Sequence, residues 1–383
     1  EVVLTDCLID ERDNIVIFGS FKGLVKVGTD TQAYSQGEGD IFIAEITNLR
    51  TLNQFRSFGG NDNETSATII SNGDLITLSG SYWGSLNIDG TILTSESMQD
   101  GFLLQIERNN FMATRMVKSI GGQSLDQING KIYDETGNLL VLGAFQDSMK
   151  WNDVEVKAPL ISSTYLGRID ASGSEKEFVN FNGNGRTQGK FMVMNPVSKK
   201  VFIVGEFEGE IIQDQLKVNS NGGMDLFVAE FDSQFNCSGL VSFGGVGKDR
   251  VTGISFDSDA NLLVSGTFVD RIDFLSKTYI SQGEEDAFLI SINPDSLTVL
   301  DVMTHSGKYE DRIDFITPVT PDYLLLGTSS KPQFDDPQIS IKILGNSQNL
   351  PSLLANLHNR FPSSRFMTLP FSTGPWNNQE DEF

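Results

Sequence analysis

Residues 249–268 read DRVTGISFDSDANLLVSGTF, and residues 284–307 read EEDAFLISINPDSLTVLDVMTHSG. These stretches contain four short apolar runs, each bounded by Asp, Asn, Gly, Ser or Pro: Val251–Phe256, Leu262–Phe268, Ala287–Ile292 and Thr298–Met303. Runs of this length, rich in β-branched and aromatic residues, are typical of β-strands, and the polar residues between them are typical of turns. Two of the linkers are tight, so the sequence predicts two adjacent hairpins that make one four-stranded antiparallel sheet.

Three markers repeat along the chain in the same register. The glycine that ends the second strand recurs with spacings of 61, 63, 62, 61 and 61 residues, at Gly19, Gly80, Gly143, Gly205, Gly266 and Gly327. An Asp-x-Phe motif opens the third strand in four copies, at Asp40, Asp100, Asp225 and Asp286, whereas the third copy has Ser163. A glycine turn, or a weakened form of it, follows the fourth strand at Gly60, Gly122, Gly183, Gly245 and Gly307. Self-similarity at a fixed period is typical of repeat architectures.

A four-stranded sheet cannot bury both faces alone, but sheets stacked face to face in a circle can. The sequence therefore predicts an all-β, six-bladed β-propeller of four-stranded antiparallel blades, with about 61 residues per repeat. The predicted blades cover residues 2–60, 61–122, 123–184, 185–245, 246–307 and 308–372. The last blade carries a predicted helical insert near 350–359, and residues 373–383 form a predicted acidic tail.

At these residues the sequence resembles the SBBP-type β-propeller repeat family of bacterial surface and secreted proteins. The matching segments are Gly137–Phe145, Gly223–Glu230 and Ser242–Gly245. The resemblance covers residues 2–330 and weakens in copies three and six. It implies a propeller fold and an extracellular setting. The family shares no catalytic residues, so the resemblance implies no active site.

Composition limits the possible partners and surroundings. The chain has 28 basic and 51 acidic residues, a formal net charge of 28 − 51 = −23, which disfavours nucleic acid and anionic membranes as partners. No apolar run approaches the roughly 20 residues that span a bilayer, so we expect no direct membrane insertion. The chain begins at Glu1 without Met, as expected of a secreted protein after signal removal or of a fragment.

The cysteines and the glycosylation motifs give little information about function. Cys7 and Cys237 lie in the first and fourth copies, so we expect two free thiols and no cysteine-based zinc site. Asn63 and Asn236 stand in Asn-x-Ser/Thr motifs in predicted loops, where glycosylation is possible.

Catalytic motifs are not recognisable in the sequence. The two histidines are His305, which stands where other copies have Phe or Ile, and His358, in the polar flank of the predicted insert. We interpret His305 as a packed substitute for an apolar residue and His358 as a surface residue. A Ser-His-Asp triad and a phosphate-binding glycine loop are unsupported.

One set of carboxylates recurs four residues after the glycine turn, at Glu64, Asp126, Asp249 and Asp311, with Gln188 in the fourth copy. In a propeller these side chains would surround one mouth of the central channel. A ring of carboxylates there would bind Ca²⁺ or another hard cation through oxygen ligands. The alternative is that each carboxylate caps its own turn.

Two tryptophans, Trp83 and Trp151, lie in the links after the second strands of copies two and three. Exposed aromatics on such loops would suit a glycan or a protein partner, and the alternative is that both are buried between blades. We therefore predict a non-catalytic extracellular or cell-surface module, structural, adhesive or protein-binding, that binds a protein partner or self-assembles. The alternative function is a glycan-binding lectin or a propeller-type glycan hydrolase or lyase, which would need paired carboxylates about 5–10 Å apart.

Overall fold

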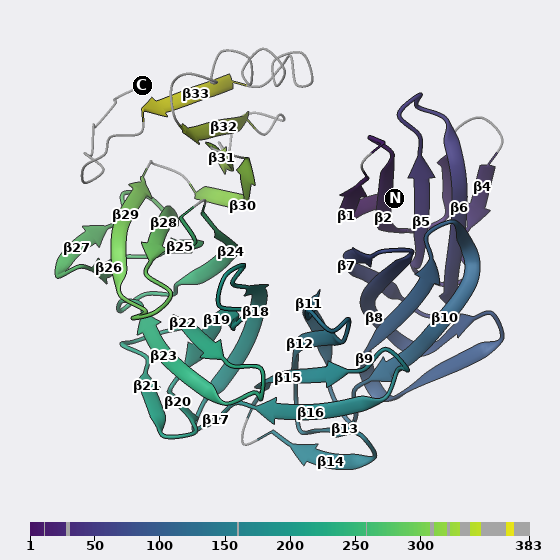
Figure 1. Cartoon of the computed structure of the whole chain (residues 1–383), viewed down its shortest axis with the longest axis horizontal. Coiled ribbons are helices and arrows are strands. Elements are labelled where there is room, and N and C mark those ends of the chain that lie inside the picture. Colours follow the sequence, from purple (N-terminus) through teal and green to yellow (C-terminus); the bar gives the residue numbers. More distant parts are fainter. Residues whose placement is uncertain are drawn as a thin grey trace. The chain divides into compact units, whose positions relative to one another are not determined.

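The computed structural model describes residues 1–10, 12–27, 31–158, 161–257, 259–306, 310–319, 322–329, 338–345 and 365–370. Every element in this part of the chain is a β-strand, which confirms the all-β prediction (Figure 1). The chain forms two compact units, Glu1–Gly189 and Lys190–Phe383. The predicted helical insert near 350–359, His358 and the tail at 373–383 lie outside the described residues.

The first unit contains the sheets of the first three copies. The first copy has β1 (Val2–Ile9), β2 (Ile15–Phe21), β5 (Asp40–Ile46) and β6 (Leu52–Gly60). The second copy has β7 (Glu64–Asn72), β8 (Leu75–Ile88), β9 (Thr91–Glu107) and β10 (Asn110–Ile120). The third copy has β11 (Gln127–Tyr133), β12 (Leu139–Phe145), β15 (Ser163–Ile169) and β16 (Glu175–Asn180). Each set pairs in antiparallel order, and the end of β6 also pairs with β8, so the first two copies form one continuous sheet.

The second unit contains the later copies, and the boundary between the units falls within β18. The fourth copy has β18 (Arg186–Met194), β19 (Val201–Glu208), β22 (Asp225–Phe231) and β23 (Cys237–Phe243), and the short β17 (Asn182–Gly183) precedes it. The fifth has β24 (Arg250–Phe256), β25 (Leu262–Phe268), β28 (Asp286–Ile292) and β29 (Val299–His305). The sixth has β30 (Asp311–Val319), β31 (Asp322–Ser329), β32 (Gln338–Gly345) and β33 (Arg365–Pro370). Because β33 runs parallel to β32, the prediction of four antiparallel strands is wrong for this copy.

The links between the second and third strands form two-stranded ribbons that the sequence did not predict. These ribbons are β3 (Leu24–Val27) with β4 (Thr31–Tyr34), β13 (Ser148–Trp151) with β14 (Val154–Lys157), and β26 (Arg271–Phe274) with β27 (Lys277–Ile280). In the fourth copy β20 (Glu210–Gln213) and β21 (Leu216–Asn219) pair in the same way, and β17 adds a third strand beside β20. The turn of the last ribbon has positive φ at Leu275 (51°) and Ser276 (60°). Neither residue is a usual signal for this turn, which normally carries Asn, Asp or Gly.

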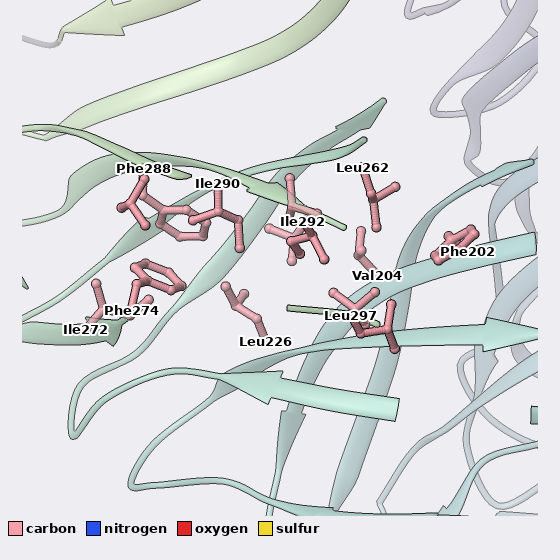
Figure 2. Close-up of a cluster of buried hydrophobic side chains, with 14 of the residues drawn as sticks. Phe202, Val204, Leu226, Leu262, Ile272, Phe274, Phe288, Ile290, Ile292 and Leu297 are labelled. Atoms are coloured by element: carbon pink, nitrogen blue, oxygen red, sulfur yellow. The ribbon is translucent and has the colours of Figure 1, made fainter. Parts of the chain in front are cut away.

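The core of the second unit lies between the sheets of the fourth and fifth copies (Figure 2). Val204 and Leu226 from the fourth copy gather with Leu262, Ile290 and Ile292 from the fifth, and all five side chains are buried. Burial of each such side chain stabilises the fold by about 1.5–3 kcal/mol. Within this unit the sheets therefore pack face to face, as blades do.

The repeated glycine is required because the neighbouring strand passes very close. A Cβ atom added to Gly143 would lie 2.0 Å from the Gln127 carbonyl oxygen and 2.4 Å from the Tyr165 ring. The same holds at Gly80, where the Thr65 carbonyl would be 2.0 Å away. Real Cβ contacts are never this short, so only glycine fits beside the aromatic residue of the third strand.

Candidate functional site

The four carboxylates predicted to form a metal ring are each enclosed in a turn. All four residues are buried: Glu64, Asp126, Asp249 and Asp311. Glu64 Oε2 accepts a hydrogen bond from the Gly60 backbone N–H at 3.0 Å, and Asp249 Oδ2 accepts one from Gly245 at 2.9 Å. Across the described ranges, no group of three or more His, Cys, Asp or Glu side chains is placed to hold a metal ion. The turn-capping alternative therefore describes the geometry, and the cation ring stays a prediction.

The counterpart of these carboxylates in the fourth copy is Thr187, so the assignment of Gln188 was wrong by one residue. The Thr187 backbone N–H donates to the Ser162 carbonyl at 3.1 Å, as Asp126 N–H donates to Gln99 at 2.8 Å. The Thr187 hydroxyl oxygen accepts from the Thr164 N–H at 2.8 Å. A threonine thus replaces the carboxylate as the hydrogen-bond acceptor of the turn.

A second buried carboxylate, from the Asp-x-Phe motif, lies against three of the glycine turns. A Cβ added to the first turn glycine would lie 2.3 Å from Asp40 Cγ, 2.5 Å from Asp100 Cγ or 2.2 Å from Asp225 Cγ. Each aspartate also caps its own entry loop; Asp225 Oδ2, for example, accepts from Asn221 N–H at 2.6 Å. Two carboxyl groups therefore flank one turn, and we call them the carboxyl pairs: Asp40–Glu64, Asp100–Asp126 and Asp225–Asp249.

Burial in these turns disfavours the charged form of the carboxyl groups. It raises the pKa of Glu64, of Asp126 and of Asp249 to about 7. It also raises the pKa of Asp100 and of Asp225 to about 6. The negative charge of the partner raises the pKa further in each pair, since Asp225 acts on Asp249 and Asp100 acts on Asp126.

A different group of charged side chains lies in the second unit, on β18, β19, β24 and the link that precedes β28. Lys190 Nζ is 3.9 Å from Glu206 Oε2, and Glu206 Oε1 accepts from the Val251 N–H at 3.3 Å. Arg250 is 3.4 Å from Glu285 Oε1, whose other oxygen accepts from the Thr267 hydroxyl at 3.0 Å. We call Lys190, Glu206, Arg250 and Glu285 the inner-strand cluster. Burial lowers the pKa of Lys190, and the charges of Arg250 and Lys248 lower it further, although Glu206 opposes them.

The inner-strand cluster stands where the repeat changes. Glu206 occupies a position that holds only small side chains elsewhere, at Ser20, Ser81, Ala144, Thr267 and Thr328. Glu285 occupies a position that holds no charge elsewhere, at Gly39, Gln99, Ser162 and Met224. The side chain of Arg250 is 44% exposed and that of Glu285 is 18% exposed, whereas that of Glu206 is 9% exposed. The cluster therefore combines one nearly buried and one solvent-accessible carboxylate.

Lys131 is a buried lysine that sequence reasoning missed. It is 4% exposed and donates to the Thr68 carbonyl at 2.7 Å, to the Ser79 hydroxyl at 2.8 Å, and to the Thr68 hydroxyl. Burial lowers its pKa to about 7. Its position is apolar in the other copies, at Cys7, Ile69, Met192, Ile254 and Ile316. That contrast between aligned copies is the signal that would have found it.

Several other predicted residues are placed differently from expectation. Trp151 is 3% exposed, packs with its ring centroid 5.3 Å from that of Phe178, and is not available to a ligand. Trp83 is half-buried in β8. The interpretation of His305 as a packed residue is wrong, because its side chain is 47% exposed, with Nε2 3.8 Å from Asp311 Oδ1.

The remaining predicted residues are exposed or half-buried, apart from the buried thiol of Cys237. Asn63 is half-buried, and Asn236 is exposed with its amide donating to Asp232 Oδ2 at 2.9 Å. Cys7 is an exposed free thiol and Cys237 a buried one. Among the described residues there is no helix long and apolar enough to cross a membrane.

No family model and no curated protein matches this chain, so the resemblance to SBBP-type repeats stays a prediction. Solved structures do match. A subtype N10 neuraminidase-like protein of A/little yellow-shouldered bat/Guatemala is 10% identical over 86% of this chain and 95% of its own, with a TM-score of 0.43. The Pan2 WD40 domain of Neurospora crassa is 10% identical over 88% and 84%, with a TM-score of 0.39. An alpha-L-arabinofuranosidase from Clostridium thermocellum is 9% identical over 79% and 93%, with a TM-score of 0.35.

These similarities concern the fold, which is a β-propeller in the neuraminidase and arabinofuranosidase structures. They correct one expectation. The expectation that the chain is not an enzyme is corrected by these structures, which include an alpha-L-arabinofuranosidase at 9% identity and so only suggest an enzyme. The absence of a familiar motif such as a Ser-His-Asp triad did not justify excluding catalysis, because a two-carboxylate site has no short sequence signature.

Proposed function

We propose that this protein is a carbohydrate-active β-propeller that hydrolyses a glycan at the inner-strand cluster, with Glu206 and Glu285 as its pair of carboxylates. One observation carries the proposal. Two glutamates from consecutive copies contact the adjacent residues Val251 and Arg250, beside a solvent-exposed guanidinium, at positions where the repeat is broken. Features needed only for folding recur in every copy, whereas this arrangement occurs once.

The chemistry of glycoside hydrolysis suits two carboxyl groups in different surroundings. One group protonates the leaving oxygen, and the other acts as nucleophile or activates water. Glu206 is nearly buried and is the candidate acid. Glu285 is oriented by the Thr267 hydroxyl and by Arg250, and is the candidate nucleophile or base.

The test is the release of reducing ends from a panel of plant, bacterial and animal polysaccharides by the wild-type chain and two variants. Glu206→Gln and Glu285→Gln should each lower the rate by about 10²–10⁴-fold, because each removes one half of the acid–base pair. Glu208→Gln, an exposed residue on the same strand, is the matched control and should keep the wild-type rate.

Two outcomes would count against the proposal. Full activity in both variants would remove the inner-strand cluster from the mechanism. Binding of a polysaccharide without any release of sugar from the panel would favour the lectin alternative, in which the cluster recognises a glycan and does not cleave it.

We further propose that six blades of about 61 residues close into one propeller and that the protein works outside the cell or at its surface. The support is the recurrence of the glycine marker in six copies, with the Asp-x-Phe motif in register in four and the glycine turn in five, and the resemblance to SBBP-type repeats. Protease protection of the intact chain, compared with chains truncated after Gly245 or Gly307, tests closure, since a missing blade should expose apolar faces.

A further inference from the structure

We propose that Thr68, Ser79 and Lys131 form an acyl-transfer site, at which Lys131 takes the hydroxyl proton of Thr68 and Thr68 attacks a small carboxylic ester. The three side chains come from β7, β8 and β11, and so from the sheets of the second and third copies. All three residues belong to the first unit, whereas Glu206 and Glu285 belong to the second. The proposal therefore does not depend on the glycan-hydrolysing function.

The first observation is the geometry of the polar groups. Lys131 Nζ contacts the Thr68 hydroxyl, and it lies 2.8 Å from Ser79 Oγ and 2.7 Å from the Thr68 carbonyl oxygen. The two hydroxyl oxygens, Thr68 Oγ1 and Ser79 Oγ, are 3.0 Å apart. A neutral amine has two N–H donors and one lone pair. The donors suit the Thr68 carbonyl and the Ser79 hydroxyl, which leaves the lone pair to accept the Thr68 hydroxyl proton.

The second observation is that Lys131 is suited to act as a base. Burial lowers its pKa from 10.5 to about 7, so a large share of the amine is neutral at neutral pH. The negative charge of Asp6, on β1, acts on Lys131 in the opposite direction and raises the pKa. A lysine with an ordinary pKa would be protonated at neutral pH and could not accept a proton.

The third observation is that the fold does not require this lysine. The fifth copy contains a similar pair of hydroxyl groups, since Thr252 Oγ1 lies 3.0 Å from Ser265 Oγ. In that copy Ile316 takes the place of the lysine, because a Cβ added to Gly253 would lie 3.0 Å from Ser265 Oγ and 3.7 Å from Ile316 Cγ1. A buried lysine at a position that is apolar in the other copies indicates a chemical role and not a packing role.

The burial of the three residues separates their roles. Thr68 is half-buried, whereas Ser79 is 0% exposed and Lys131 is buried. Thr68 is therefore the nucleophile that a substrate reaches, and Lys131 is the base behind it. Ser79 is a positioning residue, because it holds the Thr68 hydroxyl and the Lys131 amine together. A nucleophile that is only partly exposed suits an ester with a compact acyl group.

Each step of the reaction conserves atoms and charge. Thr68 Oγ1 forms a bond to the ester carbonyl carbon while its proton passes to Lys131 Nζ, which becomes an ammonium group. The bond between that carbon and the leaving oxygen then breaks, and the leaving oxygen takes the proton from Lys131. Water next attacks the acyl ester of Thr68 with Lys131 again as the base, which releases a carboxylic acid and restores the Thr68 hydroxyl.

The experiment measures how fast p-nitrophenyl acetate acetylates Thr68 in the wild-type chain and in Lys131→Met. The reaction is quenched with acid and the acetyl group is located by peptide mass spectrometry, because exposed lysines and the free thiol of Cys7 react with the same ester. The wild type should carry the acetyl group on Thr68, and Lys131→Met should lower the rate there about 10²-fold or more. Urea denaturation checks that this variant folds, as expected from Met192 at the same position of the fourth copy.

Two controls are built into the chain. Lys157→Met removes an exposed lysine of the same unit and should keep the wild-type rate at Thr68. Thr252 is half-buried like Thr68 and has a serine hydroxyl beside it but no lysine, so it should stay unmodified. An acetyl group on Lys131 or Thr252, with none on Thr68, would overturn the proposal. An equal rate at Thr68 in the wild type and Lys131→Met would overturn it as well.

The pH profile separates the base from its positioning residue. Because the neutral amine is the active form, the rate at Thr68 should rise with pH, with a midpoint at about pH 7, and then level off. Ser79→Ala removes a hydrogen-bond acceptor of the ammonium form and should move this midpoint to lower pH, which a purely structural loss would not do. A rate that rises in proportion to hydroxide without levelling off would refute the role of Lys131, and an unmoved midpoint in Ser79→Ala would refute that of Ser79.

Discussion

Replacing the buried Lys131 by methionine should stabilise the protein at neutral pH. The pKa of Lys131 falls from an ordinary value of 10.5 to about 7 because burial disfavours the ammonium form. At pH 7 this difference costs the folded state roughly 4 kcal/mol relative to an exposed lysine. Methionine fits the position, since Met192 occupies it in the fourth copy.

The gain is partly offset by lost hydrogen bonds. The Thr68 carbonyl and the Ser79 hydroxyl each lose the lysine as donor, and an unsatisfied buried carbonyl costs about 1–3 kcal/mol. We therefore expect Lys131→Met to raise the free energy of unfolding by about 1–3 kcal/mol at pH 7. The folded wild type binds fewer protons than the unfolded chain between about pH 7 and 10.5, so its stability rises with pH in that range and the advantage of the variant disappears.

The assay is urea denaturation followed by tryptophan fluorescence at pH 7, 8.5 and 10. Lys157→Met, at an exposed lysine of the same unit, is the control and should leave the pH dependence unchanged. The reasoning would be refuted by a Lys131→Met variant that is less stable than the wild type at pH 7 and has the same rise in stability towards pH 10.

Three further predictions follow from burial, close approach and the turn geometry. Trp151→Ala should lower the free energy of unfolding by about 3–5 kcal/mol and Trp83→Ala by less, because Trp151 is buried and Trp83 is half-buried. Chemical denaturation measures both losses, and equal losses would contradict this prediction. Gly143→Ala should cost at least about 2 kcal/mol in the same assay, since its Cβ would lie 2.0 Å from the Gln127 carbonyl, and an unchanged midpoint would be inconsistent with that contact. EDTA followed by Ca²⁺ should leave the thermal midpoint unchanged, because the predicted metal ligands are enclosed in their own turns.

The parts of the fold that depend on local sequence were predictable. Asp257 receives hydrogen bonds from the Asp259 and Asn261 N–H groups, both at 2.8 Å, and Asp134 makes the equivalent contact with Asn138 at 3.0 Å. These hairpin turns depend on residues two and four positions apart, so the sequence pattern identifies them directly. The register of the glycine marker was also predictable, because it repeats.

The parts that depend on tertiary contacts were not predictable. The ribbon turn at Leu275–Ser276 carries no turn signal, and β33 pairs in parallel with β32 although the neighbouring strands are antiparallel. The burial of Trp151 depends on Phe178, which is far away in sequence. A tryptophan in a link has no local feature that distinguishes a ligand-binding residue from a buried one.

The candidate site was missed because its residues belong to no motif. Glutamate is a common residue in this acidic chain, and Glu206 and Glu285 contact the adjacent residues Val251 and Arg250 only after two copies pack together. An alignment of the copies distinguishes both positions, because Glu206 replaces Ser, Ala or Thr and Glu285 replaces uncharged residues. The carboxylates that the repeat pattern brings together are the recurring turn residues, which are buried.

The proposed function is tested most directly by binding an oligosaccharide that the wild-type chain cleaves to the Glu206→Gln variant, measured by calorimetry. The account predicts that the variant binds the intact oligosaccharide about as tightly as the wild type does, because the substitution changes the volume of the side chain very little. The variant should release no product, because the substitution removes the proton donor. Cleavage at the wild-type rate would contradict the account. Equal rates of cleavage by the wild type and by a double variant with Glu206→Gln and Glu285→Gln would also contradict it.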